Sequence, residues 1–152
     1  MAPDTAAVTA DLMRDEGLRL FVYDDATGQP IRSGTLVRGH PTIGIGRALD
    51  VEGITAAEAS FLLADDVAAI SARLAAALPW FGALDGARQR VLIEMAFNLG
   101  AAGLLGFHDT LAAVAAGNYG AAASAMLASH WATQVGARAD RLAQMMRTGE
   151  PV

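Results

Sequence analysis

The chain has 152 residues and a net charge of −5, contains no cysteine, and carries eleven basic residues that are all arginine. This length suits one domain or two small lobes that share an element. The lack of cysteine excludes disulfides and thiolate metal sites, and makes synthesis in the cytosol the natural expectation. The acidic balance provides no long-range attraction to nucleic acid, so we expect no nucleic-acid partner.

The amino terminus and the most apolar run bear on export and membrane insertion. The first residues lack the basic and apolar regions of a signal peptide, which predicts a chain without its own export signal. The run over residues 54–81 carries Glu58, Asp65, Asp66 and Arg73, which argues against a membrane-spanning helix. We therefore expect no stable membrane insertion.

The first predicted element is a helix over residues 4–16, where apolar residues recur at helical spacing and Gly17 follows as a stop. A β-prone run at 21–23 then predicts a change to strands. Further along, Ser33-Gly34 lies between two short β-prone runs, which predicts a hairpin before a strand at 42–45. The expected result is a small antiparallel meander.

The rest of the chain reads as helical. Thr55 followed by Glu58 is a capping-box pattern that predicts a long helix, which Pro79 should interrupt. A second strong helix is expected over about 85–99, and shorter ones follow. The predicted fold is thus α+β and mostly helical. Its parts are a β-rich lobe with a hairpin insert over residues 18–54, a connecting helix over 55–81, and a helical lobe formed by 1–17 and 82–152.

Two carboxylates and a threonine stand out as candidates for chemistry. Glycoside hydrolysis needs a protonated acid and a second group that activates water, and Glu16 and Asp25 could supply this pair. The carboxyl end of a helix carries partial negative charge, which favours a protonated Glu16. Because most carboxylates in a chain with 16 acidic residues are solvated surface groups, the pair alone is weak evidence. Thr42 adds a hydroxyl at the head of a glycine-rich strand.

A series of short motifs then extends along nearly the whole chain. They are Asp15–Leu20, Tyr23, Asp25, Thr42–Gly46, Phe97-Asn98-x-Gly100, Gly106-Phe107, Trp131, Arg138-Ala-x-Arg141 and Arg147–Gly149. In this order, the set resembles the phage-type lysozymes, glycoside hydrolase family twenty-four. The resemblance implies a single lysozyme-like domain.

The activity implied by this resemblance is that of an endo-acting muramidase. Such an enzyme hydrolyses the β-1,4 bond between N-acetylmuramic acid and N-acetylglucosamine in peptidoglycan, with inversion of the anomeric centre. Carried over by position, Glu16 is the general acid, Asp25 positions or activates the attacking water, and Thr42 holds that water. Asp24 is a rival for Asp25, but the spacing of the family selects Asp25.

The resemblance also suggests substrate-binding residues late in the chain. It makes Arg138 a partner of Glu16 across the cleft, and Asn98, Trp131 and Gln134 saccharide-binding or cleft-framing candidates. Structural alternatives remain open, because Asn98 could be a helix cap, Trp131 a core aromatic residue, and Arg138 one half of a surface ion pair.

The chain departs from the family pattern in two places. Residues 28–41 form a longer insert, which we expect to decorate the sheet rather than line the cleft. Arg47 replaces a basic histidine, and we predict an ion pair with Asp66. The three histidines are scattered along the sequence, so neither a metal nor another cofactor is expected.

The expected partner is bacterial peptidoglycan. We expect a monomeric endolysin of a phage or prophage that stays in the host cytoplasm until release and then acts at the cell wall or in the periplasm. A separate membrane-permeabilising factor would be needed for export. Two alternatives are a lytic transglycosylase, against which Asp25 and Thr42 argue, and a non-catalytic peptidoglycan-binding or virion structural module.

Overall fold

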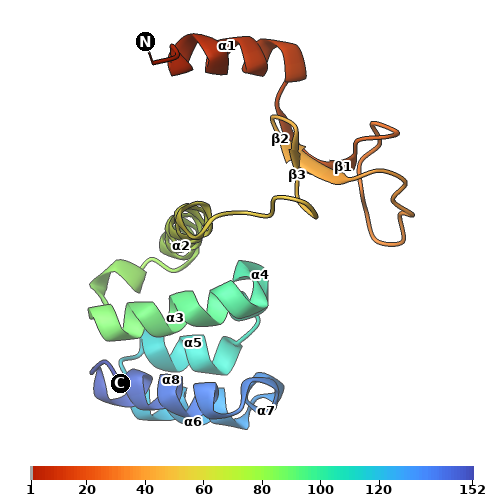
Figure 1. The fold of residues 1–152 in the computed structure, drawn as a ribbon. Coiled ribbons are helices and arrows are strands. Elements are labelled where there is room, and N and C mark those ends of the chain that lie inside the picture. The colour runs from red at the N-terminus through yellow and green to blue at the C-terminus, as the bar shows by residue number, and fades with distance from the viewer. Residues whose placement is uncertain (1) are drawn as a thin grey trace. The chain divides into compact units, whose positions relative to one another are not determined.

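The computed structural model describes residues 2–152, which divide into two compact units, one ending at Ser60 and the other spanning Phe61–Val152. Helices dominate, and the first unit contains a small antiparallel sheet (Figure 1). The predicted α+β, mostly helical fold class is confirmed. The sequence analysis assigned residues 1–17 to the helical lobe, whereas this division places the described residues among them in the unit that contains the sheet. The predicted lobe boundaries stay a prediction. Among the helices of the described residues, none has the length and apolar character needed to cross a membrane.

Helix α1 (Thr5–Glu16) agrees with the predicted first helix. The side chain of Asp4 accepts a hydrogen bond of 3.1 Å from the N–H of Ala7, which caps the first turn. Gly17 ends the helix at a φ of +70°, a conformation that other residues rarely adopt. These two local signals fix Glu16 as the last helical residue.

The sheet is made of three short strands in the order β1-β2-β3, with both neighbouring pairs antiparallel. Their bounds are β1 (Arg19–Asp24), β2 (Pro41–Gly44) and β3 (Arg47–Ala48). Tyr23 lies opposite Thr42, and Asp24 lies opposite Pro41. The end of β1 is therefore next to the start of β2, which brings two sequence-distant segments together at one edge.

The insert between β1 and β2 differs from its prediction. A turn occurs at residues 33–34 as expected, with the N–H of Thr35 bonded to the carbonyl of Arg32 at 3.0 Å. No strands flank this turn, so the predicted hairpin pairing is wrong. The hydroxyl of Thr35 accepts the N–H of Arg32 at 2.9 Å, a local bond that replaces a strand partner.

Helix α2 (Ala56–Ala77) begins with the predicted capping box. The Thr55 N–H donates to the Glu58 carboxylate at 2.8 Å, and the Glu58 N–H donates to the Thr55 hydroxyl at 3.1 Å. The same carboxylate forms an ion pair of 2.9 Å with Arg47. The guanidinium of Arg47 thus has a partner in its own unit, and pairing with Asp66, which lies in the second unit, stays a prediction.

Short and medium helices make up the rest of the second unit. They are η1 (Phe81–Ala83), α3 (Gly86–Leu99), α4 (Ala101–Leu105), α5 (His108–Ala115), α6 (Tyr119–Ala128), α7 (His130–Val135) and α8 (Ala137–Thr148). The final helix α8 begins after Gly136, which separates it from α7 with a φ of +56°.

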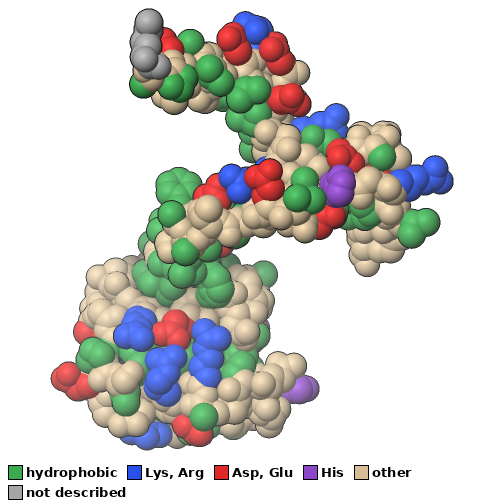
Figure 2. Space-filling view, viewed as in Figure 1, with side chains coloured by type: hydrophobic (Ala, Val, Ile, Leu, Met, Phe, Trp, Pro, Cys, Tyr) green, Lys and Arg blue, Asp and Glu red, His purple; other side chains and the backbone are tan. Residues whose placement is uncertain are grey.

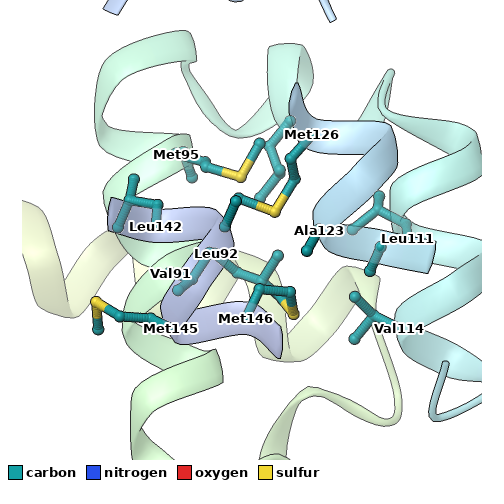
Figure 3. Close-up of a cluster of buried hydrophobic side chains, with 14 of the residues drawn as sticks. Val91, Leu92, Met95, Leu111, Val114, Ala123, Met126, Leu142, Met145 and Met146 are labelled. Carbon is teal, nitrogen blue, oxygen red and sulfur yellow. The ribbon is translucent and has the colours of Figure 1, made fainter. Parts of the chain in front are cut away.

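The hydrophobic core lies in the second unit. Its buried members are contributed by α2, α3 and the helices that follow, and they fall between Leu74 and Met146. Figure 3 shows leucine, valine and methionine side chains of α3, α5, α6 and α8 packed together. The flexible methionines fill the space between branched residues.

Leu92 provides a test of this core, because its side chain is fully buried, whereas Leu127 is 38% exposed. We expect Leu92→Ala to lower the free energy of unfolding by about 2–5 kcal/mol through lost burial and a residual cavity. The same substitution at Leu127 is the matched control and should cost much less. Chemical denaturation of both variants measures the difference, and equal losses would contradict this account of the core.

Candidate active site

Glu16 is placed by the end of α1. Its carboxylate oxygen Oε2 lies 3.7 Å from the position that a β-carbon would occupy on Gly46. Because Gly46 lies between β2 and β3, the carboxylate of Glu16 is next to the turn that joins these strands. The Glu16 side chain is exposed. Glu16 is thus found beside the turn that follows the glycine-rich strand headed by Thr42.

Asp25 directly follows β1 and is exposed. Its carboxylate oxygen Oδ1 accepts a hydrogen bond of 2.6 Å from the N–H of His40, and its own N–H donates to the His40 carbonyl at 3.1 Å. This reciprocal pair of bonds holds both the backbone and the carboxylate of Asp25 against the residue that precedes β2.

Thr42 lies on β2 and is only 3% exposed. Its hydroxyl donates to the carbonyl of His40 at 3.1 Å, the same carbonyl that accepts the Asp25 N–H. The structure therefore brings Asp25 and Thr42 together around the main chain of one residue. The hydroxyl proton of Thr42 is donated to the His40 carbonyl. The hydroxyl oxygen can still accept a hydrogen bond from another donor.

Asp24, the rival carboxylate, is buried and has a different role. It accepts backbone hydrogen bonds from Arg38 at 2.8 Å, and from Gly39 and Ala26 at 3.0 Å. The bond from the Arg38 N–H is the main reason why the pKa of Asp24 is lowered, while burial opposes this shift. Asp24 joins the end of β1 to the far end of the insert.

Gly39 allows this close approach of two segments. A β-carbon at this position would overlap the Asp25 carboxylate and lie 2.8 Å from the backbone nitrogen of Ala26. No side chain fits there without displacing the backbone next to Asp25. Gly39 is a residue that the sequence analysis did not select.

Asn98 and Trp131 contact each other in the second unit. The indole N–H of Trp131 donates to the Asn98 side-chain oxygen at 2.9 Å. Trp131 is 3% exposed and packs edge-to-face against Phe107, with ring centroids 6.3 Å apart. Trp131 therefore occupies a core position, and the amide N–H groups of the exposed Asn98 are the groups of this pair available to a ligand.

Arg138 contacts a carboxylate that the sequence analysis did not connect with it. Its guanidinium is 3.7 Å from Glu94, which also pairs with Arg141 at 2.7 Å and with Arg90 at 3.0 Å. Burial opposes ionisation of Glu94, but hydrogen bonds from Arg141 and Arg90 keep its pKa below the usual value. Figure 2 shows basic side chains gathered around an acidic one on the second unit.

The candidate residues thus form two groups. Glu16, Asp25 and Thr42 belong to the first unit, whereas Asn98, Trp131, Gln134 and Arg138 belong to the second. Gln134 is exposed on α7. Because Glu16 and Arg138 lie in different units, their pairing stays a prediction. The contacts of His40 with both Asp25 and Thr42 were missed, although its place just before Pro41-Thr42 could have indicated them.

Comparison with known proteins connects the chain with lysozymes of phages. The family model described as Phage lysozyme matches residues 13–147. The pre-baseplate central spike protein Gp5 of Enterobacteria phage T4 is 33% identical over 155 residues, covering 91% of this chain and 27% of that protein. The chain therefore spans about a quarter of the length of this curated relative.

The role of Asp24 can be tested by its pH dependence. A lowered pKa means that Asp24 stabilises the fold above its unfolded pKa of about 4 and loses this effect as the pH falls through the lower folded value. We expect Asp24→Asn to reduce the hydrogen-exchange protection of the Arg38 and Gly39 amides at pH 7. The protection lost on substitution should shrink in strong acid, and NMR exchange measurements would detect this. The exposed carboxylate Asp65, changed to Asn, is the control and should leave the protection of both amides equal to that of the wild type at every pH.

Gly39→Ala tests the close approach beside Asp25. The new methyl group should push the Asp25 carboxylate away from the His40 N–H, because the backbone of Ala26 leaves no room. We expect faster exchange of the His40 amide and a shifted Asp25 carboxyl resonance. Gly86→Ala, at a position with open space, is the matched control. An unchanged His40 amide in Gly39→Ala would contradict the geometry.

Proposed function

The chain belongs to the phage lysozyme family, and from this premise we propose that it hydrolyses the β-1,4 bond between N-acetylmuramic acid and N-acetylglucosamine in bacterial peptidoglycan. The observation that carries the proposal is the shared attachment of Asp25 and Thr42 to His40. Both side chains are bonded to the main chain of His40, which supports the proposal that the Asp25 carboxylate and the Thr42 hydroxyl oxygen act on one water molecule. Glu16 supplies a separate exposed carboxyl group at the end of α1.

In the proposed reaction, the carboxyl group of Glu16 donates its proton to the glycosidic oxygen as the bond from this oxygen to the anomeric carbon breaks. Asp25 accepts a proton from a water molecule, whose oxygen forms the new bond to the anomeric carbon from the opposite face. The oxygen of Thr42 accepts a hydrogen bond from the second O–H group of that water. This hydrogen bond fixes the direction from which the water attacks.

We propose that the two carboxylates act with inversion. Glu16 precedes β1 and Asp25 follows it, and the pairing of β1 with β2 shifts between Arg19 and Tyr23, so the ends of β1 lie closer together than those of a fully extended strand. Side chains that lean towards each other from the two ends can leave space for a sugar and a water molecule. An inverting pair needs a carboxyl separation of about 6.5–9.5 Å, whereas a retaining pair needs about 5 Å.

Residues of the second unit are proposed to bind the substrate. The exposed amide of Asn98, held through its oxygen by Trp131, can donate to acetamido or hydroxyl oxygens of the glycan. Gln134, also exposed, offers a second amide. Arg138 retains partial exposure beside Glu94, and its proposed role is to pair with the carboxylate of Glu16.

The setting in which this activity is used has two candidates. One is a free monomeric endolysin that waits in the host cytoplasm, crosses the membrane with the help of a separate permeabilising factor, and degrades the wall. The other is a peptidoglycan-degrading part of a virion. The second is favoured by the similarity to Gp5, a pre-baseplate central spike protein of which this chain matches 27%.

Activity measurements on purified peptidoglycan test the proposed function. We expect Glu16→Gln to reduce the rate of hydrolysis by about 10²–10⁴-fold, because an amide cannot donate the proton that the leaving oxygen needs. The adjacent exposed residue Asp15, changed to Asn, is the matched control and should keep most of the activity. Undiminished activity in Glu16→Gln would overturn the assignment.

The products distinguish hydrolysis from the alternative activities. Hydrolysis with inversion should release α-configured reducing ends, which NMR detects early in the reaction. A lytic transglycosylase would instead release anhydromuramic ends, which are lighter by one water in mass spectra. Binding to peptidoglycan without any turnover would favour a non-catalytic structural module.

A further inference from the structure

His40 connects the two residues proposed to handle water. Its N–H donates to the Asp25 carboxylate, and its carbonyl accepts both the Asp25 N–H and the Thr42 hydroxyl. Its side chain is held separately, because the imidazole Nδ1 lies 3.0 Å from Oδ2 and 3.2 Å from Oδ1 of Asp50. The main chain of His40 therefore holds Asp25 and Thr42, while its ionisable side chain pairs with Asp50.

We propose that His40, anchored by Asp50, is a positioning residue that orients the Asp25 carboxylate and the Thr42 hydroxyl, and that its protonation makes hydrolysis pH-dependent. This inference rests on the proposed function and extends it to a residue that does not touch the reacting atoms.

The backbone on either side of His40 explains why its side chain matters. Gly39 precedes it and is held by a hydrogen bond from its N–H to Asp24, whereas Pro41 follows and restricts His40 to extended conformations. The imidazole contact with Asp50 adds a further attachment, through the side chain of His40 itself. Asp50 is itself held near β2, because the adjacent Leu49 donates its N–H to the Pro41 carbonyl at 2.7 Å.

Two charged groups act on the imidazole. The hydrogen bond to Asp50 and the charge of Asp50 raise the pKa of His40, and the charge of Asp25 adds to this from the end of β1. The raised pKa keeps His40 protonated over a wider range, and the imidazolium donates to the Asp50 carboxylate.

The raised pKa of His40 determines the direction of the pH effect. The charged His40–Asp50 pair is complete below the ordinary His pKa of about 6.5 and weakens as the pH rises through the higher folded value. Both side chains are about half exposed, with relative exposures of 52% and 46%, so solvent screening limits the effect. We expect a change in kcat of about two- to fivefold, the range that exposed ion pairs provide.

The test compares kcat and KM of soluble peptidoglycan fragments between pH 5 and pH 9 for four variants. Asp50→Asn should lower kcat about two- to fivefold near pH 6, leave KM nearly unchanged, and move the alkaline decline in activity to lower pH. His40→Ala should remove the part of this decline that His40 causes. Glu52→Gln, an exposed carboxylate in the same loop, is the matched control and should leave the profile unchanged.

His40→Arg separates positioning from mere stability. Arginine keeps a positive charge at all these pH values, so it should preserve the pair with Asp50 and sustain kcat on the alkaline side. A profile identical in wild type, Asp50→Asn and His40→Arg would overturn the proposal, as would an effect confined to KM.

Failure of the proposed function gives a different pattern. If the wild-type protein does not hydrolyse the fragments, or Glu16→Gln keeps full activity, the function is refuted independently of His40. The positioning role then has its own readout in NMR titrations of the Asp25 carboxyl carbon and the His40 amide. Asp50→Asn should shift both resonances, and unchanged resonances would overturn the positioning role.

Discussion

The hydrogen bonds that converge on Asp24 are the constraint on which the candidate site depends. Within residues 2–60, the fully buried residues are Asp24 and Thr42, and both are polar. A segment with so little buried apolar surface has to hold its shape through hydrogen bonds. The buried carboxylate of Asp24 provides three of them, and through Arg38 and Gly39 it brings the end of the insert back to β1.

The position of His40 follows from that constraint. Because Gly39 is bound to Asp24 and Pro41 lies opposite it in the sheet, the single residue between them is fixed beside Asp25. The N–H and carbonyl of His40 then hold the side chains proposed to act on water. The 28–41 insert, expected to be decoration, thus contributes its last residues to the support of the site.

Features set by local interactions could be predicted from the sequence. The capping box of Thr55 and Glu58 and the helix stop at Gly17 involve residues within a few positions of each other, so the pattern alone indicates them. The partners of Asp24 lie 14 and 15 residues away, and no local pattern indicates them. Two adjacent aspartates look alike in the sequence, yet one is buried as a backbone acceptor and the other is exposed.

In the second unit, too, contacts between residues far apart in the sequence could not be predicted. This unit also explains how a site with little apolar burial can belong to a stable fold. A sequence motif selected Arg138 as a candidate site residue. Its contact with Glu94, which lies on another helix, could not be predicted from that motif. This unit carries the hydrophobic core, from Leu74 to Met146, and so supplies most of the apolar burial. Since the first unit contributes little to that core, its hydrogen-bonded site can change conformation at a smaller energetic cost. Separating the core from the proposed water-activating residues is consistent with the proposal that their geometry responds to the charge of His40.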